Sequence, residues 1–71
     1  MSTISTDLQP QAQAALAASP IYELQDLLVE ERDGMLVILG AVSSFYHKQL
    51  AQEVVRSVCR GTDVVNAIFV E

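Results

Sequence analysis

The hydrophobic positions of the chain follow two periodicities, one typical of helices and one typical of strands. Small apolar residues recur at spacings of three and four in residues 7–19, and a wider apolar face runs through residues 45–60. Nearly continuous apolar runs occupy residues 35–42 and 64–70, and residues 22–32 mix apolar with acidic positions. The expected order is therefore helix, strand, strand, helix, strand, and the expected fold class is α+β.

Turn and capping residues set the expected boundaries of these elements. Asp7 is a good N-cap for the first helix, and Ser19-Pro20 should end it, because the residue before a proline is pushed out of the helical region. Asp33-Gly34 is a hairpin signal, since glycine readily adopts a positive φ angle and aspartate tolerates one. The first two strands are therefore expected to be antiparallel.

The remaining connections predict a three-stranded mixed sheet packed against two helices. Gly61 should end the second helix, and the strand–helix–strand crossover makes the third strand parallel to the second. Gly40 interrupts the second strand, which indicates a bulge or the close approach of another element, here the second helix. Residues 7–71 are expected to form a single domain, and residues 1–6 a flexible N-terminus.

The composition excludes several classes of protein. With 51% hydrophobic and 18% charged residues, the sequence is not that of a disordered chain. Its one cysteine excludes a disulfide scaffold, and its net charge of −5 disfavours binding to nucleic acid. A domain of 71 residues also has little room for a walled active site, so we expect no enzyme. So high an apolar content in so small a domain indicates an oligomer or a partner.

This apolar excess is concentrated on a sheet face that should be polar. When helices cover one side of a sheet, the other side normally carries polar residues at alternate positions. In this sequence the face opposite the helices is expected to hold Leu28, Val37, Leu39, Ala41, Val65, Ala67 and Phe69. We expect this face to mediate homo-oligomerisation. The alternatives are that the first helix covers it, or that a lipid or a different protein does.

The candidate residues for catalysis or metal binding are few. Cys59 falls on the apolar face of the second helix, where a free cysteine normally packs as a small hydrophobic residue. His47 lies twelve residues earlier, which is roughly 18 Å along a helix, so the two cannot form a catalytic pair. One histidine without nearby ligands is not a metal site. We therefore expect no catalytic, metal-binding or cofactor-binding residue.

An aromatic and basic cluster opens the second helix. Phe45, Tyr46 and Lys48 combine rings with a cation, which suits contact with a lipid surface or a protein partner. The alternative is that Phe45 packs onto the core as a hydrophobic staple while its neighbours face solvent. The net charge of −5 weakens the lipid interpretation, because anionic membrane surfaces attract basic segments.

An ordered set of motifs resembles the BON domain family (bacterial OsmY and nodulation). The run from Asp33 to Val42 follows the pattern DG-x-V-x-L-x-G-x-V, with Leu36 and Ile38 at its first two apolar positions, and Ser44, Lys48, Ala51, Gly61 and the run from Val65 to Val70 follow in order. The glycine–valine pair usual before the last strand is here Gly61-Thr62-Asp63-Val64, so that turn is reshaped. In this pattern Gly34, Gly40, Gly61 and Asn66 are structural positions.

The resemblance implies an αββαβ fold, a binding role at phospholipid surfaces and no catalytic residues. For Asn66, an amide within an apolar strand, we expect a hydrogen bond to a turn or edge backbone group, with ligand binding as the alternative. As written, the sequence has no recognisable signal peptide or membrane-spanning run, which predicts a cytoplasmic protein. A fragment of a longer member of that family would be periplasmic.

Overall fold

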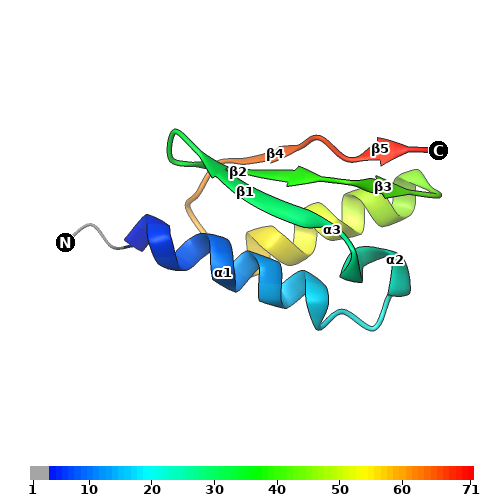
Figure 1. Ribbon diagram of the computed structural model, residues 1–71, viewed down its shortest axis with the longest axis horizontal. Coiled ribbons are helices and arrows are strands. Elements are labelled where there is room, and N and C mark those ends of the chain that lie inside the picture. Colours follow the sequence, from blue (N-terminus) through cyan, green and yellow to red (C-terminus); the bar gives the residue numbers. More distant parts are fainter. Residues whose placement is uncertain (1–3) are drawn as a thin grey trace.

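Both long helices lie on one face of the sheet. The computed structural model describes residues 4–71, with side chains from Leu8 onward. Helices α1 (Ile4–Ala17) and α3 (Phe45–Val58) pack against each other and against the sheet. Figure 1 shows the helices in one layer and the strands in the other. The sheet consists of β1 (Leu28–Arg32), β2 (Met35–Leu39) and β4 (Val64–Asn66).

The sheet is mixed, as the sequence predicts. Its strand order is β1-β2-β4, with β1 antiparallel and β4 parallel to the central β2. A second parallel pair, formed by β3 (Ala41–Val42) and β5 (Phe69–Val70), continues β2 and β4 toward the far end of the molecule. The α+β class and the two strand directions are thereby confirmed.

The expected first strand is wrong over its N-terminal part. Residues 22–25 form a single helical turn, α2 (Tyr22–Gln25), and β1 begins only at Leu28. The reason lies in the apolar spacing: Leu24 and Leu27 are both buried, and side chains three residues apart share one side of a helical turn but opposite sides of a strand. This turn carries the chain from α1 to the sheet.

The second and third strands are each interrupted, which the sequence predicts only at Gly40. This glycine separates β2 from β3 with a φ of +134°, a conformation that side-chain-bearing residues rarely adopt. A Cβ atom at this position would lie 2.7 Å from Leu27 Cδ2. The close neighbour is therefore Leu27, before β1, and not the second helix as expected. Residues 67–68 make the matching interruption between β4 and β5.

The helix ends also differ from the expected ones. Helix α1 begins at Ile4 and not at Asp7, since no glycine or proline interrupts residues 4–6. The expected flexible segment therefore overlaps the helix at residues 4–6, and its residues 1–3 lie outside the described part. Helix α3 ends at Val58 with Cys59 as its C-cap, two residues before the expected end. Thr62 N–H then donates to Cys59 O at 3.3 Å, and Gly61 lies within this turn with a φ of +81°.

A single layer of small aliphatic side chains fills the space between the sheet and the helices. The inner sheet face contributes Val29, Leu36, Ile38, Val42 and Ile68, and the helices contribute Ala12, Leu16, Ala51, Val55 and Cys59. Leu24 and Leu27 close the layer at the α2 end. Helix α1 packs here, against α3 and β1, so the alternative that it covers the opposite face is wrong.

Two glutamines of α1 close the free edge of β1. Gln13 Nε2 donates to Leu27 O at 2.7 Å, and Gln13 Oε1 accepts from Val29 N–H at 2.8 Å. Gln9 Nε2 donates to Val29 O at 2.6 Å. At Leu27 and Val29 the two side chains thus replace hydrogen bonds that a further strand would make, which disfavours edge-to-edge pairing along this part of β1.

We predict that Gly40→Ala destabilises the fold by about 2 to 4 kcal/mol, because it combines backbone strain with a clash against the buried Leu27. Gly61→Ala is the matched control, since its φ is also positive but no atom lies within 4 Å of the added Cβ. It should cost only about 1 to 2 kcal/mol. Urea denaturation measures both, and equal losses would contradict the role of Leu27.

Candidate functional site

The sheet face opposite the helices carries the apolar residues that were expected there. Cross-strand register pairs Leu28 with Leu39, Val37 with Val65, and Ala41 with Phe69. The exposed members of this group, hereafter the outer face, are Leu28, Ala41, Val65, Ala67 and Phe69, with Leu39 half-buried among them. These residues line a largely apolar surface that runs from β1 to β5.

Val37 is the one residue of this set that offers almost no surface. It points to the outer face but is only 7% exposed. Its register neighbours, Glu30 on β1 and Val65 on β4, flank it on both sides. Beyond it, Arg32 Nη2 and Glu30 Oε1 form an exposed ion pair of 2.5 Å on the β1 side. The apolar outer face is therefore bordered by a polar margin at β1.

The aromatic cluster at the start of α3 faces solvent. Phe45 and Tyr46 are 74% and 67% exposed, so the staple interpretation of Phe45 is wrong. Lys48 is half-buried, and its backbone carbonyl accepts from Asn66 Nδ2 at 2.9 Å. Tyr22, at the start of α2, is equally exposed, and nothing in the sequence pattern singles it out.

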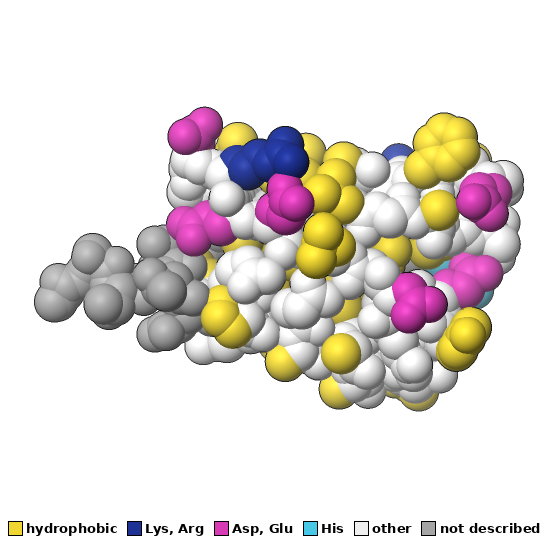
Figure 2. Space-filling model, in the orientation of Figure 1, with side chains coloured by type: hydrophobic (Ala, Val, Ile, Leu, Met, Phe, Trp, Pro, Cys, Tyr) yellow, Lys and Arg dark blue, Asp and Glu magenta, His cyan; other side chains and the backbone are white. Residues whose placement is uncertain are grey.

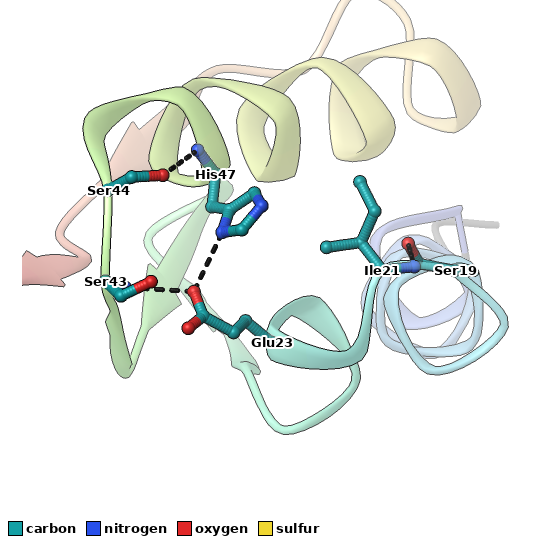
Figure 3. Close-up of polar contacts among 6 residues, drawn as sticks. All are labelled: Ser19, Ile21, Glu23, Ser43, Ser44 and His47. Carbon is teal, nitrogen blue, oxygen red and sulfur yellow. Dashed lines mark hydrogen bonds and ion pairs between the residues drawn. The ribbon is translucent and has the colours of Figure 1, made fainter.

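A polar cluster missed by sequence reasoning joins α2 to the start of α3. Glu23 Oε1 accepts from Ser43 N–H at 2.9 Å and lies 2.8 Å from His47 Nδ1. Ser44 caps α3 by accepting from His47 N–H at 3.2 Å (Figure 3). The Glu23 and His47 side chains are 24 positions apart in the sequence, so no local spacing reveals the contact.

The hydrogen bonds to Glu23 favour its ionised form. The Ser43 backbone N–H, then the Ser43 side chain and His47, lower the pKa of Glu23 to about 2. The carboxylate thus stays charged throughout the neutral and mildly acidic range. On its other side, the imidazole of His47 meets the ring of Tyr46, with centroids 5.8 Å apart.

Asn66 ties the last strand to α3. Besides its bond to Lys48 O, its Nδ2 donates to Gln52 Oε1 at 3.1 Å. Its Oδ1 accepts from Ile68 N–H at 3.3 Å, across the interruption between β4 and β5. The amide is thus fully engaged within the chain. Gly34, the other motif glycine, lies in the β1–β2 turn beside Asp33, and both have positive φ angles.

The described side chains offer little for catalysis. Cys59 is buried, burial raises the pKa of its thiol, and its Sγ lies 3.5 Å from Leu8 O. Among the described residues, no three His, Cys, Asp or Glu side chains are grouped closely enough to hold a metal ion. Within the same part of the chain, no helix has the length and apolar character needed to cross a bilayer.

A known family profile matches the sequence. The family profile described as the BON domain matches residues 5–71, which is nearly the entire chain and includes the outer face, the aromatic cluster and Asn66. No curated protein matches the sequence significantly.

We predict that Glu23→Gln lowers stability at neutral pH but loses this effect in acid. The folded-state pKa of Glu23, about 2, lies below its ordinary value of 4.5, so the charged form stabilises the fold above pH 4.5. This contribution should disappear as pH falls from 4.5 toward 2. Urea midpoints measured across this range should converge, with the exposed Glu31→Gln as the control for net charge. A gap that stays constant with pH would contradict the prediction.

Proposed function

Because the chain belongs to the BON domain family, we propose that it is a non-catalytic binding module that self-associates through its outer face. BON domains are generally non-catalytic binding modules associated with phospholipids. In this chain, the outer face offers the apolar surface through which two or more copies would stack. The module would then act by burying this surface against another copy and not by catalysing a reaction.

One observation carries this proposal: both long helices pack on the same side of the sheet, so no element of the described chain covers the outer face. Large apolar patches on small domains commonly mark interaction sites. Stacking of two sheets face to face, about 10 Å apart, is a standard way to bury such a surface. A two-fold axis would bring the same residues of both copies together.

The sheet edges favour face-to-face stacking over edge-to-edge pairing. At the start of β1, Gln9 and Gln13 already occupy the backbone groups of Leu27 and Val29 that another strand would need. At the other margin, Asn66 Oδ1 occupies the Ile68 N–H. Strand pairing at these positions would have to displace the three side chains, whereas stacking through the outer face displaces only water.

We predict that Leu39→Asp converts the assembly into monomers, because a carboxylate would be buried without a partner in the stacked interface. Val65→Lys should do the same. Its matched control is Val58→Lys on α3, since Val65 and Val58 are both 41% exposed and lysine suits a helix C-terminus. Size-exclusion chromatography with light scattering measures the mass. A wild-type mass of 7.7 kDa at low micromolar concentration would disprove the proposal.

Lipid binding through Phe45, Tyr46 and Lys48 is the alternative, and the exposure of both rings favours it. Electrostatics opposes it. The net charge of −5 is repelled by anionic lipid headgroups, and the carboxylate of Glu23 binds His47, the residue that follows Tyr46.

We predict that the protein stays in the supernatant when it is sedimented with phosphatidylglycerol vesicles at 0.15 M salt. The reason is that four Lys and Arg residues against nine Asp and Glu residues cannot offset this repulsion. Vesicle binding that Leu39→Asp leaves intact and Phe45→Ser abolishes would establish the lipid alternative.

A further inference from the structure

The four Phe and Tyr residues of the sequence either belong to residues 41–47 or lie in segments that contact them. Phe45 and Tyr46 belong to it, and Phe69 pairs in register with Ala41. Tyr22 precedes Glu23, whose carboxylate binds this segment at Ser43 and His47. In Figure 1 the elements that carry these residues, α2, β5 and the start of α3, lie at the same end of the molecule. We call the four rings and residues 41–47 the aromatic end.

The exposure of these rings is unusual. They are 67% to 75% exposed, and the buried core contains no aromatic residue. Aromatic side chains normally supply the largest buried areas of a domain, and they are enriched at interfaces when they lie on the surface. Four exposed rings at one end of a small domain therefore indicate a contact surface.

The charges at this end are mainly negative. Glu71 N–H donates to Val42 O at 2.9 Å, which places Glu71 beside residues 41–47 on the β5 side. Glu23 and Asp26 belong to α2 and its C-cap. Figure 2 shows acidic and hydrophobic side chains together at the end that carries α2 and β5. Lys48 is the only basic residue of the sequence next to residues 41–47.

The other basic residues belong to other parts of the molecule. Arg32 ends β1 and is paired with Glu30, Arg56 lies in the last turn of α3, and Arg60 follows that helix. The aromatic end thus combines exposed π surfaces with three carboxylates. A guanidinium group suits such a surface, because it stacks on aromatic faces and binds carboxylates through planar pairs of hydrogen bonds.

We propose that the aromatic end binds an arginine-containing extended segment of a partner protein. Phe45, Tyr46 and Tyr22 provide the stacking surfaces, and Glu23, Asp26 and Glu71 provide the opposite charge. Ala41 and Phe69 belong both to this end and to the outer face, so the binding contact is assigned to Phe45, Tyr46 and Tyr22, which lie outside the self-association surface.

The polar cluster prepares this surface for binding. Glu23 fixes His47, and the imidazole of His47 lies against the ring of Tyr46. Part of the ordering that a bound arginine requires is therefore already present in the free protein, which reduces the entropic cost of binding. The carboxylate of Glu23 also remains accessible to a ligand, since its side chain is 32% exposed.

The test uses a fluorescein-labelled decapeptide of alternating arginine and serine, titrated with the full chain and followed by fluorescence anisotropy. An equal peptide with citrulline in place of arginine keeps the shape and removes the charge. We expect binding of the arginine peptide only. Phe45→Ser/Tyr46→Ser should weaken it at least tenfold, at roughly fivefold for each ring. Val58→Ser, an exposed apolar position on the same helix, is the control and should leave it unchanged.

A second pair of variants tests the charge. Asp26→Asn/Glu71→Gln should weaken binding and reduce its dependence on salt, whereas the monomeric Leu39→Asp variant should bind as the wild type does. Equal affinity for both peptides would overturn the proposal, and so would full affinity in the Phe45→Ser/Tyr46→Ser variant with its circular dichroism unchanged. Sedimentation with phosphatidylcholine vesicles that depends on Tyr46 would assign the surface to a membrane instead. None of these outcomes changes the light-scattering mass, which tests self-association separately.

Discussion

Contact between two long helices and one sheet face determines nearly everything else in this molecule. The contact is made by small and branched aliphatic side chains such as Ala12, Ala51 and Ile38, which let the helices approach the strands closely. This buried layer contains no aromatic ring, and Tyr22, Phe45, Tyr46 and Phe69 all lie exposed outside it. The helices cover only one face of the sheet, and the other face is left without a covering element of the described chain. The same packing arrangement thus leaves two surfaces available for binding, the outer face and the aromatic end.

The sequence predicts the parts of the fold that depend on local patterns. The Asp33-Gly34 turn, the crossover to the last strand and the inward positions of Leu36 and Ile38 are all present. The error at residues 22–25 arises because a single helical turn is too short for its spacing to outweigh neighbouring strand signals. The partner of Gly40 depends on tertiary packing, which periodicity does not describe.

The candidate surfaces likewise include residues that local sequence patterns predict and residues that only tertiary packing brings together. Alternation along the strands is enough to assign residues to the outer face. It does not show that Val37 is covered, because that depends on which residues lie beside it in the neighbouring strands. The sequence predicts only part of the aromatic end, namely Phe45 and Tyr46. Tyr22, Glu23 and Phe69 join them only because separate segments meet at residues 41–47, and such meetings leave no local signal in a sequence.

The glutamines that close β1 also have a consequence for how the chain folds. Gln9 and Gln13 satisfy the backbone of a strand 14 to 20 positions further along, so β1 is complete only when α1 is in place. The hairpin is therefore not an independent unit, and helix and sheet should form in one cooperative step. If α1 detaches, β1 becomes an open template for pairing with another chain. Exchange of α1 between two copies would restore the same glutamine contacts, which makes domain swapping the natural misassembly of this fold.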